Sequence, residues 1–114
     1  MDIKPNELFK FLSDENRLNI LVMLLIDDYC VCDMERFLGL KQANISKHLM
    51  GLRKAHIVTT NKEFMWVHYS IHKSFIENNG LLIDYLKETA LYQYFVSELK
   101  TFQKDVCKPK WQNE

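Results

Sequence analysis

The feature that most constrains this chain is a pair of short helical patterns separated by a short turn that contains a glycine. Apolar residues at helical spacing predict one helix over residues 31–38 and another over residues 42–55. Their apolar positions are Met34, Phe37, Leu38, Ile45, Leu49 and Leu52. Gly39 stands where a helix commonly ends, so only residues 39–41 separate the two helices. This arrangement predicts a helix-turn-helix over about residues 31–55.

The segment before this unit predicts two further helices. A short helix is expected at residues 7–11, after Pro5. Ser13 is expected to be the N-cap of the next helix, because its hydroxyl suits the free backbone N–H groups of a first turn. Apolar residues at helical spacing continue this second helix until Asp27 and Asp28 end it.

The segment after the unit predicts a β-hairpin and a long helix. β-Branched and aromatic runs at residues 57–60 and 65–71 favour two strands, with residues 61–63 as their turn. One helix is expected over about residues 81–106, after the breaker at residues 78–80. The predicted fold class is mostly α with a small β-hairpin wing at about 57–71, a winged helix-turn-helix. We expect the whole chain, 1–114, to form one domain.

The predicted C-terminal helix carries more apolar residues than one narrow stripe can hold. They are Leu82, Tyr85, Leu86, Leu91, Tyr92, Phe95, Val96, Leu99 and Phe102. A helix that is apolar over much of its girth needs a second surface to cover it besides its own core. We therefore expect a homodimer that forms through the terminal helices.

Charge is concentrated in the middle of the chain. The formal net charge is zero, but residues 41–62 hold five bases and no acid. These bases are Lys41, Lys47, Arg53, Lys54 and Lys62. A local cationic segment attracts nucleic acid even when the whole chain is neutral, and this one spans the second helix of the unit and the hairpin.

The start of the second helix offers side chains that suit contacts with DNA. With the apolar stripe turned inward, the exposed residues are Gln42, Ala43, Asn44, Ser46 and Lys47. Gln and Asn pair with adenine edges, and Ser and Lys suit bases and phosphates. Lys41 at the N-cap and Lys62 at the hairpin tip are candidate phosphate contacts. The alternative is a solvated polar helix face. The cationic segment favours double-stranded DNA as the partner.

The stretch YCVCD, residues 29–33, holds two of the three cysteines. Cys30 is expected at a helix N-cap and Cys32 one step inside the helix, where the helix dipole lowers the pKa of a thiol. Such a pair binds a soft metal ion, senses oxidation, or simply packs. Cys107, near the C-terminus, is the one other thiol that could complete a three-sulfur site.

Other function classes find no support in the sequence. There is no Ser/His/Asp set, no paired carboxylate and no glycine-rich phosphate loop, so an enzyme is not expected. The histidines lack the spacing of a zinc site, and no organic cofactor is expected. No apolar run is long enough to span a membrane, and the first residues do not resemble a signal peptide. The expected location is the cytoplasm.

Three segments in order resemble one family. LSDENRLNILVMLL, CVCDMERFLGLKQANISKHLMGLRKAHIV and EFMWVHYSI look like the arsenic-repressor (ArsR/SmtB) family of winged-helix repressors, over roughly residues 8–71. The resemblance implies a dimeric repressor that leaves its operator when a metal or metalloid binds. The CVCD motif implies thiolate ligands at Cys30 and Cys32. Where similar arsenite repressors carry a third cysteine, this chain has Glu35, which leaves Cys107 as the candidate third ligand.

The resemblance gives a concrete functional hypothesis and leaves two alternatives open. We expect a transcriptional repressor that As(III) or Sb(III) releases from operator DNA, with Cd(II) and Pb(II) as further candidate inducers. The first alternative is a thiol redox sensor on the same fold, in which Cys30 or Cys32 forms a disulfide with Cys107. The second is a constitutive DNA-binding or protein-interaction module with passive cysteines.

Overall fold

The computed structural model describes residues 3–63 and 66–104. Four helices come first in the chain: α1 (Pro5–Leu12), α2 (Glu15–Ile26), α3 (Val31–Leu38) and α4 (Gln42–Lys54). Two strands follow, β1 (Val58–Glu63) and β2 (Trp66–Ile71), and then three helices: α5 (Lys73–Asn78), α6 (Gly80–Lys87) and α7 (Ala90–Leu99). The mostly helical fold with one hairpin agrees with the predicted fold class.

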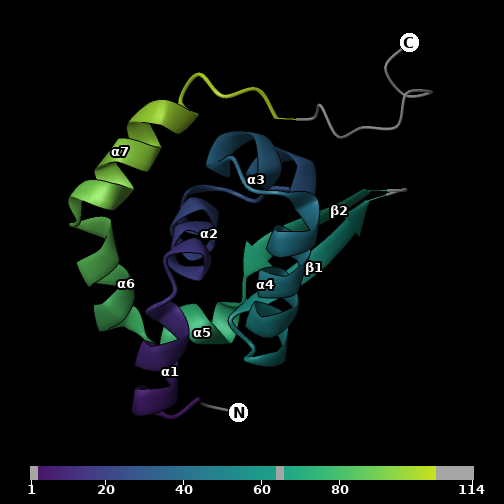
Figure 1. Cartoon of the computed structure of the whole chain (residues 1–114). Coiled ribbons are helices and arrows are strands. Elements are labelled where there is room, and N and C mark those ends of the chain that lie inside the picture. Colours follow the sequence, from purple (N-terminus) through teal and green to yellow (C-terminus); the bar gives the residue numbers. More distant parts are fainter. Residues whose placement is uncertain (1–2, 64–65, 105–114) are drawn as a thin grey trace.

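Helix α2 lies at the centre of the molecule. It contacts α1, α4, α7 and β2, so the other elements are arranged around it (Figure 1). Its residues 20–24 are all buried. The α4 helix and the hairpin lie on one side of α2, and α6 and α7 lie on the other (Figure 1). This arrangement leaves one face of α4 open to solvent, away from α6 and α7.

The helix-turn-helix forms as predicted. Helix α3 has the expected bounds, and Gly39 caps its C-terminus with φ +70°, a left-handed conformation that glycine adopts without a steric penalty. Helix α4 ends at Lys54, with Ala55 as its C-cap. Met34, Ile45, Leu49 and Leu52 are buried, as their spacing predicts.

The wing differs from the prediction at its tip. Strands β1 and β2 pair antiparallel from Val58↔Ile71 to Glu63↔Trp66. The expected turn at residues 61–63 is wrong, because these residues continue β1 and pair with β2. Tyr29 adds a short bridge on the other side of β2, where it pairs with Tyr69. The hairpin is thus joined to the segment just before α3.

The predicted N-cap of the second helix is off by one residue. The cap is Asp14, whose carboxylate accepts a hydrogen bond from the Arg17 backbone N–H at 3.0 Å. Ser13 instead closes α1, and its hydroxyl donates to the Lys10 carbonyl oxygen at 2.6 Å. Two adjacent residues could cap this helix, and the carboxylate takes that place.

The long C-terminal helix is wrong in its extent. It is divided into α6 and α7, and the helical part ends at Leu99. Thr89 makes the break, because its Oγ1 accepts from the Tyr92 backbone N–H at 3.3 Å and donates to the Leu86 carbonyl oxygen at 2.6 Å. Helix α5 was not predicted. His72 caps it, and the His72 Nδ1 accepts from the Ser74 backbone N–H.

Within residues 3–63 and 66–104, no helix combines the length and the apolar character that crossing a membrane requires.

Candidate nucleic-acid interface and cysteine site

The outward face of α4 carries the residues that the sequence predicts to contact DNA. Lys41, Gln42, Ala43, Ser46 and Lys47 are exposed, and Asn44 is half-buried. On the opposite face, Ile45, His48, Leu49 and Leu52 are buried against the core. The structure thus brings the predicted set together at the N-terminal end of one helix. Their role in binding stays a prediction.

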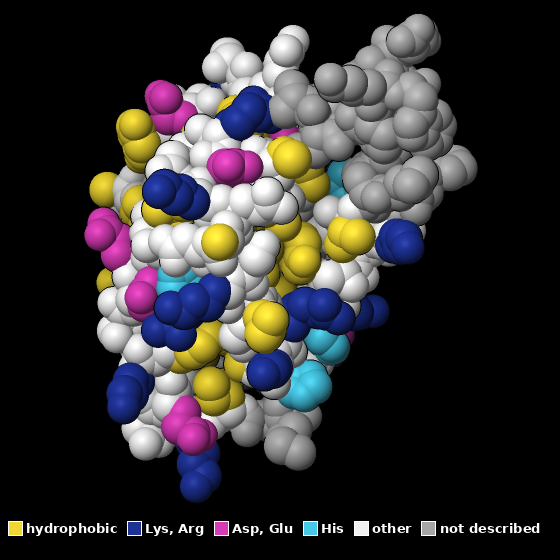
Figure 2. Space-filling model, turned by 45° about the vertical axis from the view of Figure 1, so that its right-hand side comes forward, with side chains coloured by type: hydrophobic (Ala, Val, Ile, Leu, Met, Phe, Trp, Pro, Cys, Tyr) yellow, Lys and Arg dark blue, Asp and Glu magenta, His cyan; other side chains and the backbone are white. Residues whose placement is uncertain are grey.

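Basic side chains extend this face beyond the start of α4. Arg53 and Lys54 are exposed in its last turn, and Lys62 is exposed on β1. Figure 2 shows dark blue Lys and Arg side chains gathered on this side of the molecule, with hydrophobic side chains between them. Since residues 41–62 contain five bases and no acid, this face offers several cations of the kind that phosphates favour.

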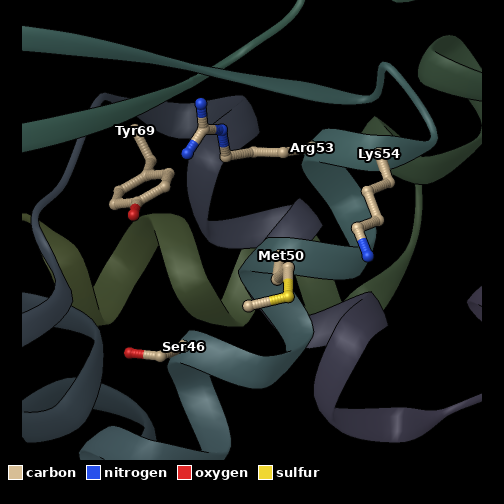
Figure 3. Close-up of a pocket in the computed structure, with 5 residues that line it drawn as sticks. All are labelled: Ser46, Met50, Arg53, Lys54 and Tyr69. Carbon is tan, nitrogen blue, oxygen red and sulfur yellow. The ribbon is translucent and has the colours of Figure 1, made fainter.

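A groove lies between α4 and the wing. It has a volume of about 470 Å³ and is lined by Ser46, Met50, Arg53, Lys54 and Tyr69 (Figure 3). The sequence predicts Ser46 as a DNA contact and places Arg53 and Lys54 in the cationic segment, but it predicts a role for neither Met50 nor Tyr69. Met50 could have been found from its helical spacing to Ser46 and Arg53. Tyr69 could not, because its place depends on how the hairpin packs against α4.

Helix α4 is held on α2 by one polar contact as well as by its apolar side. The His48 Nε2 lies 3.9 Å from the Asp14 Oδ1. The Arg17 backbone N–H, which donates to the same carboxylate, is the main cause that keeps the pKa of Asp14 below its usual value, and nearby His48 acts in the same direction. His48 therefore has a structural contact.

Cys30 lies at the N-cap of α3, as predicted. The side chain is 4% exposed, and the backbone N–H donates to the Asp33 Oδ2 at 3.3 Å. The Cys30 Sγ lies 3.2 Å from the same oxygen. Cys30 and Asp33 together form a capping box in which sulfur takes the place of the usual hydroxyl. The position of the Cys30 sulfur is therefore fixed by the first turn of α3.

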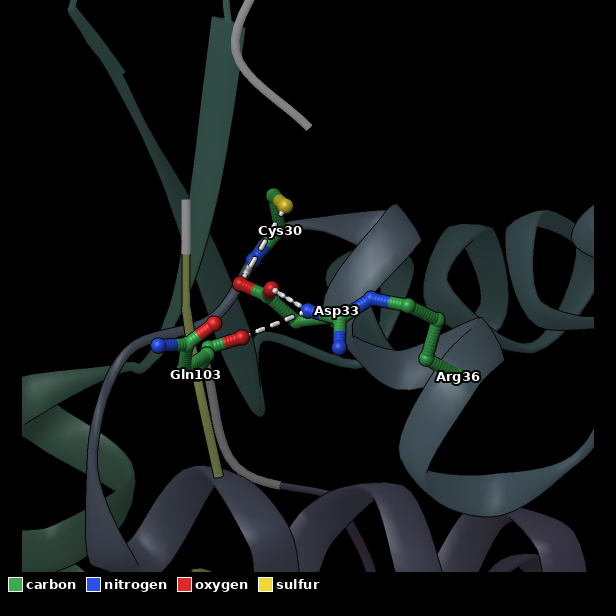
Figure 4. A network of polar contacts seen from close by, with 4 residues as sticks. All are labelled: Cys30, Asp33, Arg36 and Gln103. Atoms are coloured by element: carbon green, nitrogen blue, oxygen red, sulfur yellow. Dashed lines mark hydrogen bonds and ion pairs between the residues drawn. The ribbon is translucent and has the colours of Figure 1, made fainter. Parts of the chain in front are cut away.

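A network joins this turn to the segment after α7 (Figure 4). Arg36 Nη2 donates to the Asp33 Oδ1 at 2.9 Å and to the Gln103 carbonyl oxygen at 2.7 Å. The Arg36 guanidinium carbon also lies 4.4 Å from the centre of the Phe102 ring. Asp33 is fully buried, so its carboxylate depends on these partners.

A second contact holds the same C-terminal segment beside the cysteine site. Lys104 Nζ donates to the Asp27 Oδ2 at 2.9 Å. Burial alone raises the pKa of Asp27, but the hydrogen bond from Lys104 and the one from the Asp28 backbone outweigh it, so the pKa is lowered. Residues 102–104 thus contact both α3, through Arg36, and the end of α2, through Asp27. Cys107 lies outside the described residues.

Cys32 differs from Cys30 in its surroundings. Its side chain is exposed. Partial burial, together with the negative charges of Glu35 and Asp33, raises the pKa of the Cys32 thiol. The expectation that the helix start lowers this pKa is therefore wrong, because the two acids oppose the dipole. Among the described residues, no group of three or more His, Cys, Asp or Glu side chains is placed to hold a metal ion.

The cysteine site and the groove are joined through the backbone. Tyr29 precedes Cys30, and its N–H and C=O exchange hydrogen bonds with the C=O and N–H of Tyr69, at 3.3 and 2.8 Å. Tyr69 lines the groove beside α4. Helix α3 also packs directly on α4. Two sets of contacts thus connect the Cys30 segment to the cationic face: the hydrogen bonds of Tyr29 with Tyr69, and the packing of α3 on α4.

Comparison with known proteins shows which family has this architecture. Residues 14–60 match the family model described as bacterial regulatory protein, arsR family. The arsenical resistance operon repressor of Escherichia coli (strain K12) is 41% identical over 68 residues, 59% of this chain and 58% of that protein. The arsenical resistance operon repressor of Bacillus subtilis (strain 168) is 33% identical over 84 residues, 73% of this chain and 78% of that protein. The chain belongs to the arsR family.

A solved structure supports the same assignment for this arsR-family chain. Reduced HlyU from Vibrio cholerae N16961 superposes with a TM-score of 0.61 at 34% identity, over 70% of this chain and 81% of HlyU. The winged helix-turn-helix is therefore the family fold. The chain spans a little more than half the length of the first curated relative that it matches, 58%. These relatives are regulators rather than enzymes.

Proposed function

We propose that this arsR-family chain is a transcriptional repressor that a thiophilic metal or metalloid ion releases from operator DNA. One observation carries the proposal: the helix that begins with Cys30 and Cys32 packs directly on the helix that presents an exposed, acid-free cationic face. A sulfur site and a DNA-binding surface thus share an interface. Both similar curated proteins are named as arsenical resistance operon repressors.

In the DNA-binding half of the proposal, α4 enters the major groove. Gln42, Ala43, Asn44, Ser46 and Lys47 would meet base edges and nearby phosphates, as the start of a recognition helix does. Lys41 and Lys62 would neutralise phosphates on either side. The exposed positions of these residues support this assignment.

A homodimer would present two such helices to a near-palindromic operator. Large apolar side chains stay exposed on the terminal helices: Phe9 of α1, Leu81 and Tyr85 of α6, and Tyr94 of α7. Leu81 is 88% exposed, and a patch of several exposed large apolar side chains is typical of a protein–protein contact. Helices α6 and α7 lie on the side of α2 away from the hairpin (Figure 1), so a dimer through these two helices would leave both α4 faces free.

In the effector half, As(III) or Sb(III) would bind the thiolates of Cys30 and Cys32, with Cys107 as third ligand. Each As–S bond forms as a thiol proton and an arsenite hydroxide leave together as water. Gln103 contacts Arg36 of α3, and Lys104 contacts Asp27. These contacts support the choice of Cys107, three residues further along the chain, as the third ligand. Cd(II) and Pb(II) share the preference for sulfur and are further candidate inducers.

Binding would act on the DNA through α3. Drawing two sulfurs two residues apart into one centre would distort the capping box and the first turn. That distortion passes to α4 by direct packing and to the wing through the bridge of Tyr29 with Tyr69. A useful inducer must favour the free state by about 1–3 kcal/mol per site.

A titration of the protein–operator complex with arsenite tests the proposal. We expect fluorescence anisotropy of labelled operator to fall as arsenite rises, and the response to disappear in Cys30→Ser and Cys32→Ser. Ser97→Ala on α7 is a matched control that should respond as the wild type does. Operator binding that survives arsenite saturation would rule out the mechanism.

X-ray absorption of the arsenite-loaded protein tests the third ligand. We expect three sulfur neighbours in the wild type and two in Cys107→Ser. Two neighbours in both proteins would exclude Cys107 while leaving the rest of the proposal standing.

A redox-sensing repressor is the second candidate. It is favoured by the docking of residues 102–103 on Arg36, which also binds Asp33 of the Cys30 capping box. In this version, hydrogen peroxide oxidises the thiols of Cys30 and Cys107 to a disulfide, and two water molecules form. Release by peroxide with no response to arsenite would select this candidate. Cys32→Ser would then keep its response, since that thiol takes no part.

A further inference from the structure

Met50 is an apolar residue of α4 whose side chain does not pack in the hydrophobic core. The other large apolar residues of α4 are buried, whereas Met50 is 57% exposed. It lies on the same helix face as Ser46, one turn earlier, and Arg53, about one turn later. An exposed methionine among charged and polar residues loses the hydrophobic stabilisation that burial would give it. It is therefore placed to be buried when a partner binds.

The surroundings of Met50 limit the kind of partner. Its groove is closed on the wing side by Tyr69 and bordered by Arg53 and Lys54 (Figure 3). Two cations beside an apolar floor suit a polyanion that carries an apolar group, and they oppose an ordinary apolar protein surface. Tyr69 is half-buried, and its backbone is tied to Tyr29 by two hydrogen bonds, so this wall of the groove is held in place.

We infer that Met50, with Tyr69 beside it, forms the contact that selects thymine at one position of each operator half-site. Thymine is the base that presents a methyl group in the major groove, and an apolar side chain recognises it there. Met50 lies two turns from Gln42, about 12 Å along the helix axis, so this position is distinct from the one that the helix start would read. Arg53 and Lys54 would hold the flanking phosphates. The inference rests on the proposed DNA binding.

Replacing thymine by deoxyuridine removes only the 5-methyl group and therefore tests this contact directly. The duplex is first obtained by selecting with the full-length reduced protein from a random-sequence DNA library. Each thymine of the selected duplex is then replaced in turn. One replacement per half-site is expected to weaken wild-type binding about fourfold, as expected for one buried methyl group.

The matching protein variants make a double-mutant cycle. Met50→Ala should bind the thymine and deoxyuridine duplexes equally at the sensitive position, because the methyl has lost its contact. Met50→Leu should keep most of the discrimination. Lys54→Ala should weaken binding to both duplexes by the same factor and lower the salt dependence, since a phosphate contact does not read the base. Because both side chains, Met50 and Lys54, are exposed, the three variants should fold.

Three outcomes would overturn the inference. If no deoxyuridine replacement changes wild-type affinity, no thymine methyl is read. If Met50→Ala discriminates as strongly as the wild type, another residue reads the methyl. If the library yields no enriched duplex, the proposed DNA binding itself fails, and this inference fails with it; the first two outcomes leave DNA binding intact.

Discussion

Replacing the buried carboxylate of Asp33 should destabilise the protein at the start of the cysteine helix. Asp33 accepts from the Cys30 backbone N–H at 3.3 Å and from Arg36 at 2.9 Å, and it is fully buried. Asp33→Ala leaves the Cys30 N–H without its carboxylate acceptor and leaves the guanidinium with only the Gln103 carbonyl oxygen. The first turn of α3 also loses a favourable negative charge.

The magnitude follows from these contacts. A buried N–H that loses its acceptor costs about 1.5 kcal/mol, and a carboxylate near a helix N-terminus contributes about 0.5 kcal/mol. The Arg36 side chain is 38% exposed, so water screens the ion pair and its contribution is below about 1 kcal/mol. Removing Asp33 also relieves the cost of burying its charge. We therefore expect a net loss of about 2 kcal/mol.

Asp33→Asn separates the hydrogen bond from the charge. The amide oxygen can still accept from the Cys30 N–H, whereas the ion pair with Arg36 and the dipole term are lost. We expect a loss of about 1 kcal/mol for this variant. Glu35→Ala removes an acid from the same helix outside this network and should change stability by less than about 0.5 kcal/mol.

Urea unfolding of the reduced proteins, followed by circular dichroism at one fixed protein concentration, measures the series. With an m-value of roughly 2 kcal/mol/M, Asp33→Ala should lower the midpoint by about 1 M and Asp33→Asn by about half as much. The reasoning is refuted if Asp33→Ala matches the wild type within about 0.5 kcal/mol, or if Asp33→Asn is as unstable as Asp33→Ala.

Three further predictions follow from other contacts. Gly39→Ala should cost about 1 kcal/mol in urea unfolding, because φ is +70°, whereas Gly80→Ala should cost nothing, since a Cβ there meets no atom within 4 Å. The pKa of Asp27 is lowered in the folded protein, so the ionised carboxylate stabilises the fold above pH ~4. This stability is lost as the pH falls through the folded-state pKa. Lys104→Met should reduce the loss, as measured by acid-unfolding curves. Burial and the charges of Asp27 and Asp33 raise the pKa of Tyr29 to about 12. The stability of the fold should therefore fall as the pH rises from about 10 towards 12. Tyr29→Phe should remove that fall, as measured by ultraviolet-monitored unfolding.

The sequence by itself determined the parts of this protein that depend on neighbouring residues. The bounds of α3, its cap at Gly39 and the outward face of α4 follow from helical spacing and from cap positions. Those signals act within one or two turns of chain, so no other part of the fold is needed to interpret them. The cationic segment at residues 41–62 is local for the same reason.

Prediction from the local sequence failed where two adjacent residues could both cap a helix, or where pairing with a distant strand fixed the backbone conformation. Asp14 rather than Ser13 caps α2, although both residue types suit an N-cap. Thr89 divides the expected long helix, and a threonine there was a readable cap signal that the apolar spacing obscured. Strand β1 continues through residues 61–63 because β2 pairs with them.

Only the tertiary structure decided how the two candidate sites are connected. Gln103 contacts Arg36 of α3 and Lys104 contacts Asp27 at the end of α2, and these contacts span 67 and 77 residues of sequence. The bridge of Tyr29 with Tyr69 and the groove beside Met50 likewise depend on packing between distant segments. The complete burial of Asp33 follows from the same packing. The burial of a residue, and the distances and charge interactions between remote residues, are set when the chain folds. The spacing of residues in the sequence therefore does not predict them.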